Sequence, residues 1–179
     1  CLRGCRIQDS GSLATNSIVA NNRMYRLLES SIYLASGSYG YDSTNANGCR
    51  NILCTGNTIQ ECFNNSLLNI GSQFCQFKDN VCAKGCNAGI QDYSSIDCVY
   101  ENNNIFDCNR KSYNGIGNNA DARAAIAIEG STGIAGYGEY TATVLNNSLF
   151  KCNQGAASSV VGLRISRTHT GKKLVKNRP

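Results

Sequence analysis

The sequence almost lacks proline: one occurs in 179 residues, at the last position, and tryptophan is absent. No stretch approaches the roughly 18–20 consecutive apolar residues of a membrane span, so no membrane partner is predicted. The only histidine is His169, and no paired C-x₂-C spacing occurs, so we expect no metal site and no cofactor. Ala, Leu, Glu and Lys do not dominate, which argues against a helical bundle.

Asparagine (23), glycine (18) and serine (18) together make up a third of the chain, and the formal net charge is +5. The eleven cysteines are an odd number, so they cannot all pair within one chain. We expect them to be free thiols that pack as small buried apolar side chains in a reducing compartment. The chain begins at Cys1 and shows no charged-then-apolar leader, so we expect a fragment without a signal peptide.

A hidden repeat organises the chain. Four segments align without gaps on Asn57, Asn80, Asn103 and Asn147, at separations of 23, 23 and 44 residues, and Asn22 extends the series. Small or apolar residues occupy the columns five and three before each anchor, and two and five after it. Three of these columns read Val19, Cys54, Phe77, Tyr100, Val144; Met24, Ile59, Cys82, Ile105, Leu149; and Leu27, Cys62, Gly85, Cys108, Cys152.

A further apolar segment follows about ten residues after each anchor. It contains Ile32 and Leu34; Leu68 and Ile70; Ile90; Ile126 and Ile128; Val161 and Leu163. Period-2 alternation before the anchors predicts strands, and four residues after them Glu61, Lys84, Asp107 and Lys151 alternate in charge, as on an outward face. Each repeat therefore holds three short strands, which bury their apolar side only when successive coils stack. Asn at a fixed turn suits this arrangement, because it tolerates the left-handed conformation and its amides can stack.

We therefore predict an all-β, single-stranded parallel β-helix with about 22–23 residues per coil. The helix covers residues 1–163, with insertions at 36–50, 109–123 and 130–139. The basic segment 164–179 is a last coil or a cut end. Its positive charge lacks interleaved aromatic residues, so no nucleic-acid partner is predicted.

The Asn anchors and the Cys/Ile/Leu/Phe columns between Ser12 and Leu163 resemble the right-handed parallel β-helix of the pectate-lyase-like superfamily. Within it, the pattern is most similar to the β-helical body of bacteriophage tailspikes. This resemblance implies a homotrimeric virion protein that folds in the reducing bacterial cytoplasm and recognises a bacterial surface polysaccharide. An outward column of Tyr25, Phe106 and Phe150 offers a stripe for lateral packing, unless insertion 109–123 covers it.

Insertions 36–50 and 130–139 leave the same corner of the coil and carry tyrosines, so we expect them to flank a groove above Tyr93, Ser94 and Phe74. Such loops are also tolerated in solenoids without any function. The candidate sugar-binding residues are Tyr39, Tyr41, Asp42, Tyr93, Tyr137, Tyr140 and Arg164.

Hydrolysis of a glycosidic bond requires two carboxylates. Asp97 is expected on a first strand, pointing outward and stacked against Thr141, with Glu139 nearby and Glu129 ending the third strand at the same corner. These three acids are the catalytic candidates, although a Glu129–Arg164 ion pair between equivalent positions would explain Glu129 structurally. The sequence thus favours a glycoside hydrolase-type depolymerase; the alternatives are a non-catalytic receptor-binding or structural domain and, third, a polysaccharide lyase.

Overall fold

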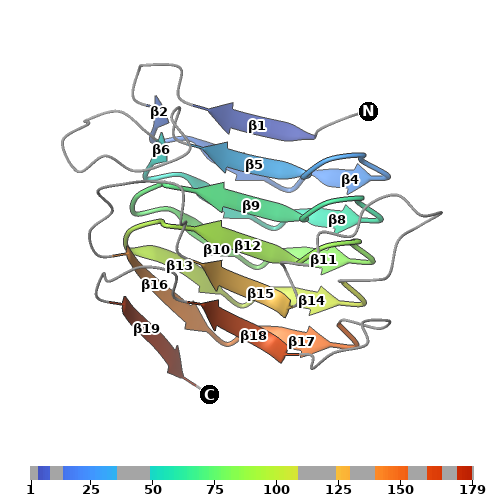
Figure 1. Ribbon diagram of the computed structural model, residues 1–179. Coiled ribbons are helices and arrows are strands. Elements are labelled where there is room, and N and C mark those ends of the chain that lie inside the picture. Colours follow the sequence, from blue (N-terminus) through green and yellow to red (C-terminus); the bar gives the residue numbers. More distant parts are fainter. Residues whose placement is uncertain are drawn as a thin grey trace.

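In a computed structural model of the chain, the regular elements among the described residues are all β-strands (Figure 1). It describes residues 4–8, 14–35, 49–108, 124–129, 140–152, 161–166 and 173–178. No helix long and apolar enough to cross a membrane occurs among these residues. The strands stack in layers, with the two chain termini at opposite ends of the stack.

Three parallel sheets and one short pair account for all nineteen described strands. Sheet A has the order β1 (Cys5–Gln8), β5 (Ile32–Ala35), β9 (Leu67–Ile70), β12 (Ile90–Tyr93), β15 (Ala124–Glu129), β18 (Val161–Ser166). Sheet B has the order β19 (Lys173–Arg178), β16 (Tyr140–Leu145), β13 (Cys98–Glu101), β10 (Gln76–Lys78), β7 (Leu53–Thr55), β3 (Ile18–Ala20). Sheet C has the order β17 (Ser148–Phe150), β14 (Asn104–Phe106), β11 (Val81–Ala83), β8 (Thr58–Gln60), β4 (Arg23–Tyr25), and β2 (Ala14–Thr15) pairs with β6 (Cys49–Arg50).

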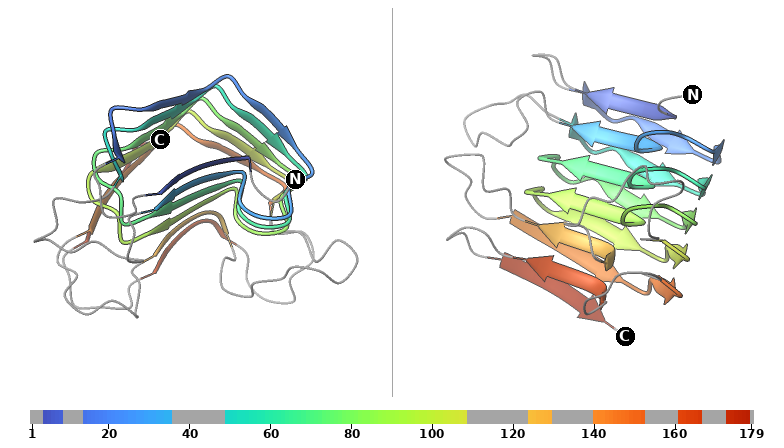
Figure 2. Two further views of the ribbon diagram at one scale, coloured as in Figure 1. Left: turned by 90° about the horizontal axis from the view of Figure 1, so that it is seen from above. Right: turned by 45° about the vertical axis from the view of Figure 1, so that its right-hand side comes forward.

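The chain visits the three sheets in a fixed order. A strand of sheet B is followed by one of sheet C and one of sheet A, as in β7, β8, β9 and then β10, β11, β12. We call one such circuit of the chain through sheets B, C and A a pass. Each pass adds one parallel strand to every sheet, and seen from above the successive passes superimpose (Figure 2). The predicted all-β class with stacked parallel strands is confirmed.

The anchor asparagines form a continuous ladder between passes. The Oδ1 atom of Asn80 accepts both the backbone N–H of Asn57, at 3.1 Å, and its Nδ2 group, at 3.0 Å. The Nδ2 group of Asn80 in turn donates to Asn103 Oδ1 and to the Cys54 carbonyl, each at 3.0 Å. The same contacts join Asn22 to Asn57 and Asn103 to Asn147. Stacking of the amides is thus confirmed.

The left-handed conformation, however, belongs to the residue before each anchor. These residues all have φ between 48° and 64° and are Asn21, Gly56, Asp79, Asn102 and Asn146. The expectation that the anchors themselves adopt this conformation was wrong. The preceding residue makes the bend, and the bend turns the anchor amide into the stack, where Asn57, Asn80 and Asn103 are fully buried.

The predicted core columns of sheets B and C are confirmed by the register, which pairs Val19, Cys54, Phe77 and Tyr100 in turn. In sheet A one prediction was wrong. Ile32 pairs with Leu67, so Leu67 and Asn69 face inward, while Leu68 and Ile70 lie on the outer face. The predicted inward positions of this strand are one residue away from the observed ones, and a shift of one residue moves every side chain of a strand to the opposite face of the sheet.

Two further segments take part in the parallel pairing. The end of insertion 36–50 belongs to the regular structure, because β6 pairs with β2, Arg50 forms a single bridge with Gln73, and Gln73 forms one with Ile96. Part of the basic segment continues the stack as well, because β19 pairs with β16 along its whole length.

The ten described cysteines are free thiols, as predicted, and eight of them are buried. Burial raises the pKa of Cys54 and of Cys82 well above the usual thiol range. The hydrogen bond from Cys108, by contrast, lowers the pKa of Cys152 to about 7. Buried neutral thiols thus fill positions in the core that apolar side chains occupy in other passes.

Replacing Asn80 by Ala should lower the free energy of unfolding by about 3 kcal/mol, because two donors of Asn57 would be buried without an acceptor. Urea denaturation of the folded chain measures this change. Asn22→Ala is the matched control, since Asn22 is exposed and Asn57 Oδ1, which loses the Asn22 amide, still accepts the Asn22 backbone N–H. The cost of this variant should be below about 1 kcal/mol. Equal costs for the two variants would contradict the role assigned to the buried ladder.

Alkaline pH should destabilise the fold. Thiols of the unfolded chain ionise near pH 9, whereas buried Cys54 and Cys82 ionise only at higher pH, so their stabilising contribution is complete below pH 9 and is lost as the pH rises. Ionisation of each thiol in the unfolded chain then lowers the free energy of unfolding by up to about 1.4 kcal/mol per pH unit. Urea denaturation under reducing conditions between pH 8 and pH 10.5 measures the slope. Cys82→Ala should make the decrease of the free energy of unfolding with pH less steep, and Cys152→Ser should not. An unchanged slope in Cys82→Ala would contradict this account.

Candidate functional site on the outer face of sheet A

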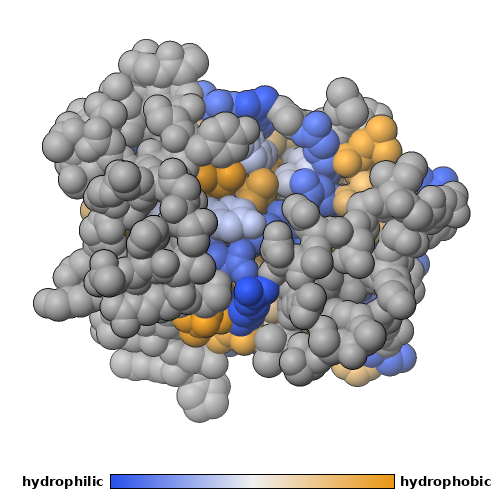
Figure 3. All heavy atoms as spheres, viewed as in Figure 1, coloured by the Kyte–Doolittle hydropathy of each residue, from blue (hydrophilic) through white to orange (hydrophobic). Residues whose placement is uncertain are grey.

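The outer face of sheet A presents two columns of side chains that run along the stack. The parallel register places Arg6, Tyr33, Leu68, Gln91, Ala127 and Arg164 in one column, and Gln8, Ala35, Ile70, Tyr93, Glu129 and Ser166 in the other. Adjacent members are separated by the strand spacing of about 4.8 Å. Figure 3 views this side of the molecule and shows hydrophobic and hydrophilic described residues next to one another.

The part of this face nearer the N-terminus is apolar and aromatic. Ala35, Leu68 and Ile70 form a small buried cluster, and Tyr33 and Tyr93 pack against it while remaining half-buried. The guanidinium of Arg6 lies over the Tyr33 ring at 5.2 Å from its centre. Two tyrosine rings on an apolar base, with a cation at one end, are thus arranged along the stack.

The part nearer the C-terminus is polar and centres on Glu129, which is only 6% exposed. Gln91 Nε2 donates to Glu129 Oε2 at 3.0 Å and also to the Tyr93 hydroxyl. Arg164 Nη1 lies 3.5 Å from Glu129 Oε1. The carboxylate is therefore held between an amide and a guanidinium, and we call Gln91, Tyr93, Glu129 and Arg164 the Glu129 cluster.

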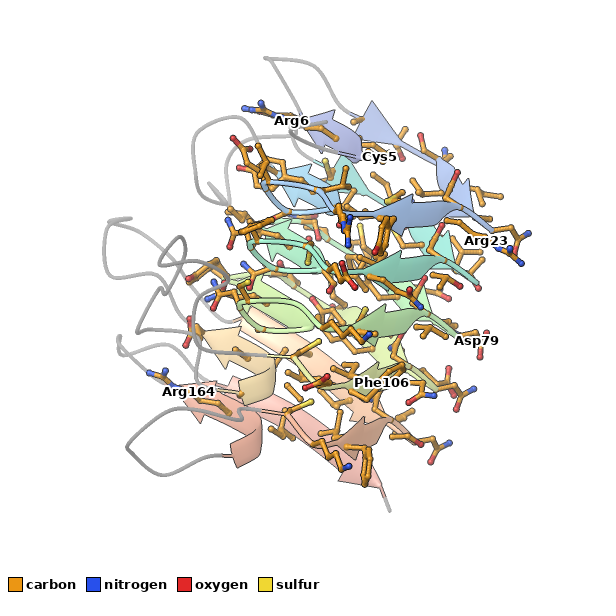
Figure 4. All side chains as sticks on the ribbon, turned by 90° about the vertical axis from the view of Figure 1, so that its right-hand side faces the viewer. Cys5, Arg6, Arg23, Asp79, Phe106 and Arg164 are labelled. Atoms are coloured by element: carbon orange, nitrogen blue, oxygen red, sulfur yellow. The ribbon has the colours of Figure 1, made fainter. Side chains whose placement is uncertain are left out.

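The structure brings together three of the predicted site residues, Tyr93, Glu129 and Arg164. Their register differs from the prediction: Arg164 pairs with Ala127, and Glu129 pairs with Ser166. The predicted ion pair nevertheless forms as a diagonal contact, because the long arginine side chain reaches across to the neighbouring column. Figure 4 shows that Arg6 and Arg164 project from the same side of the stack near its opposite ends.

Asp97 is not part of a strand, contrary to expectation. It has φ of 50° and forms the bend directly before β13, which begins at Cys98. The equivalent residues Asn16, Asn51 and Phe74 also have positive φ, so this position forms a bend in four passes. In the following pass the equivalent residue, Thr141, lies within β16. Asp97 is exposed, and it lies four residues beyond the end of β12, which carries Tyr93.

The predicted residues Tyr39, Tyr41, Asp42, Tyr137 and Glu139 lie outside the described residues, and Tyr140 is described only as the first residue of β16. Of the residues predicted to lie beneath the groove, Ser94 is buried and Phe74 is exposed.

Gln91 and Asn65 were missed by the sequence analysis. Asn65 Nδ2 donates to Gln91 Oε1 at 2.6 Å, which extends the Glu129 cluster by one residue toward the N-terminus. Asn65 Oδ1 is buried and has no hydrogen-bond partner among the described residues. A period-2 pattern around Tyr93 would have placed Gln91 on the same face, because residues two apart share a face of a strand.

A second polar cluster lies inside the stack and was not foreseen. Asp92, 1% exposed, accepts a hydrogen bond from the Tyr100 hydroxyl at 2.5 Å and one from the Ser95 N–H at 3.2 Å. Asn69 Nδ2 donates to the Tyr100 hydroxyl at 2.9 Å, and Ser72 donates to Asn69. Burial and the neighbouring Asp92 carboxylate raise the pKa of Tyr100. Full burial separates this cluster from any solute, so its role is structural.

The chemistry of the outer face follows from these groups. Tyrosine rings can stack on sugar faces, while the carboxylate, amides and guanidinium can bond to hydroxyls. In the described part of the chain, no three His, Cys, Asp or Glu side chains are grouped so that they could hold a metal ion.

Comparison with protein families, with curated proteins and with solved structures yields no match for this chain.

The ion pair of the Glu129 cluster should contribute measurably to stability. A double-mutant cycle with Glu129→Gln and Arg164→Met should give a coupling of about 1 kcal/mol, because Glu129 is buried. The control cycle uses Arg26 and Glu61, which are 3.0 Å apart but have side chains 65% and 23% exposed, and should give only a few tenths of a kcal/mol. Urea denaturation measures both couplings. A larger coupling for the exposed pair would contradict this prediction.

Proposed function

We propose that the chain is a segment of a right-handed parallel β-helix that binds a bacterial surface polysaccharide on the outer face of sheet A. The order of the sheets supports the helix, because sheets B, C and A are visited in turn on every pass. The repeat of 23 residues between Asn57, Asn80 and Asn103 is one coil of this helix. Longer passes, such as the 44 residues between Asn103 and Asn147, carry insertions.

The observation that carries the binding proposal is the line of side chains along the outer face. Tyr33 lies on β5 and Tyr93 on β12, two strands apart, which corresponds to about 10 Å. Glu129 and Arg164 follow on the next two strands. A linear polymer lying along the stack would meet aromatic rings first and then hydrogen-bonding groups, which suits an extended glycan.

The polar groups of this face favour hydroxyl-rich ligands. Carboxylate, amide and guanidinium groups together both accept and donate hydrogen bonds, as sugar hydroxyls require. The native context we propose is a phage tailspike in the virion, folded in the reducing bacterial cytoplasm.

Binding without cleavage is the function that the geometry supports best. Glu129 is engaged by Arg164 and Gln91, and hydrolysis would require a second carboxylate about 5–10 Å away. A depolymerase would draw that second acid from Asp97 or Glu139. A lyase would instead need Arg164 as a base, although Arg164 is paired with Glu129.

Lateral assembly into a homotrimer is part of the same proposal. The outward column of sheet C contains Tyr25, Gln60, Ala83, Phe106 and Phe150 in register. Tyr25 is 53% and Phe150 61% exposed, so both rings are accessible for packing against another subunit. Sedimentation of the purified chain tests this part separately.

The binding proposal is tested with a panel of purified O-antigen and capsular polysaccharides. Isothermal titration should detect binding to at least one of them, while new reducing ends would indicate hydrolysis and an unsaturated uronate product would indicate a lyase. No binding across a panel drawn from many bacterial serotypes would overturn the proposal.

On the polysaccharide that binds, Tyr33→Ala and Tyr93→Ala should each weaken affinity about tenfold, because each removes one stacking ring worth about 1.4 kcal/mol. Tyr25→Ala is the matched control: it removes an exposed ring from sheet C and should leave affinity unchanged. If Tyr25→Ala weakens binding as much as Tyr93→Ala does, the outer face of sheet A is not the site.

A further inference from the structure

Two pairs of cysteines are stacked in the same way in adjacent passes. Cys108 and Cys152 each follow a bend at which φ is positive, Asp107 with φ of 55° and Lys151 with φ of 47°. Cys75 and Cys98 form the other pair, one pass apart at the start of sheet B. In the column that contains Cys62, Gly85, Cys108 and Cys152, Gly85 separates Cys62 from Cys108, so only Cys108 and Cys152 are cysteines in adjacent passes.

Within each pair, the two sulfur atoms occupy equivalent places. Cys108 Sγ lies 3.5 Å from the Cys82 carbonyl of the preceding pass and 3.6 Å from that of Phe106. Cys152 Sγ lies 3.5 Å from the equivalent carbonyls of Ile105 and Phe150. Equal surroundings one pass apart place one sulfur above the other, with Cα atoms about 4.8 Å apart, inside the range that a disulfide spans.

The two pairs differ in access. Cys75 and Cys98 are both fully buried, and so is Cys108, whereas Cys152 is only partly buried. A small oxidant in solution can therefore reach the sulfur of Cys152, but not that of Cys108, Cys75 or Cys98. This asymmetry is what a reversible dithiol requires: an accessible attacking thiolate and a sheltered resolving thiol beside it.

We propose that Cys152 and Cys108 form a redox-active dithiol that a peroxide converts into a disulfide. The Cys152 thiolate attacks one peroxide oxygen, the O–O bond breaks, and hydroxide leaves, which gives a sulfenic acid. The Cys108 sulfur then attacks the Cys152 sulfur, the S–O bond breaks, and water leaves with the thiol proton. Two electrons pass from the two sulfurs to the peroxide, and a thiol reductant reverses the process.

The electrostatics agree with this division of roles within the pair. The pKa of Cys75 is likewise lowered to about 7 by its hydrogen bond with Cys98, so access, and not the pKa, distinguishes the two pairs. The hydrogen bond from Cys108 lowers the pKa of Cys152 to about 7, so a large thiolate fraction exists at neutral pH, although the facing Asp107 carboxylate opposes this effect. The same hydrogen bond, with burial, raises the pKa of Cys108 and keeps it protonated. Cys5, the other partly buried cysteine of the described part, has its pKa raised by burial and is less reactive.

The disulfide would join two consecutive passes across the 44 residues that separate positions 108 and 152. It would thereby tie β17 to β14, neighbours in sheet C, by a covalent bond. Such a link restricts the unfolded chain and should raise the urea concentration at the midpoint of unfolding.

The experiment treats the reduced full chain with hydrogen peroxide, blocks the remaining thiols with N-ethylmaleimide, and maps the products by peptide mass spectrometry. The expected main product is one peptide pair linked through Cys108 and Cys152, with Cys75 and Cys98 still reduced. The oxidation rate should rise up to about pH 7 and then level off, whereas an ordinary thiol would continue to gain reactivity toward pH 9.

Three variants separate the roles. Cys152→Ser should abolish the linked product, and Cys108→Ala should leave a sulfenic acid at Cys152 that dimedone traps. Cys75→Ser is the control and should still give the 108–152 link; circular dichroism verifies that each variant is folded. The proposal is overturned if Cys152 stays reduced, if it pairs only between chains, or if Cys75 and Cys98 oxidise as fast in the folded protein.

Discussion

The whole structure depends on one hydrogen-bonding unit, the side-chain amide of the anchor asparagine. An amide has two acceptor sites and two donor hydrogens, and Asn80 uses all four: its oxygen accepts twice from Asn57, and its nitrogen donates to Asn103 and to the Cys54 carbonyl. Aspartate lacks the donors, and glutamine would place them one methylene too far. The unbroken row of asparagines from Asn22 to Asn147 therefore sets the register of these five passes on one another.

Because the ladder sets the register, the rest of each pass is free to vary in length. Pairing in sheet A occurs at offsets of 35 residues between Ile32 and Leu67 but only 23 between Leu67 and Ile90, and the strands still align. The extra residues leave between strands, where bends with positive φ already interrupt the extended chain. Loop length costs little free energy once the ends are held, so insertions accumulate at the corners.

The sequence predicted the ladder and the columns of sheets B and C, because each depends on residue identity at a constant spacing, and it predicted the free thiols from the odd number of cysteines. Sheet A was harder. The inward positions of sheet A lie ten and twelve residues after each anchor and include Leu67, Asn69 and Asp92. The prediction followed hydrophobicity instead and therefore placed Leu68 and Ile70 in the interior. An interior carboxylate contradicts the binary pattern, and the hydrogen bonds from the Tyr100 hydroxyl and the Ser95 N–H to Asp92 explain it. The Glu129–Arg164 contact was foreseen as a pair, but its diagonal geometry follows from arginine length and not from register.

Stacking also limits which charges can lie side by side. Two carboxylates in neighbouring passes of one column would be about 4.8 Å apart and would repel. The charged column of sheet C therefore alternates in sign, with Glu61 close to both Arg26 and Lys84. On the outer face of sheet A, Glu129 has Tyr93 and Ser166 as its column neighbours and draws its cation from the next column. A catalytic pair of acids in such a scaffold must accordingly combine different columns or an insertion, whereas binding residues can follow a single column along the stack.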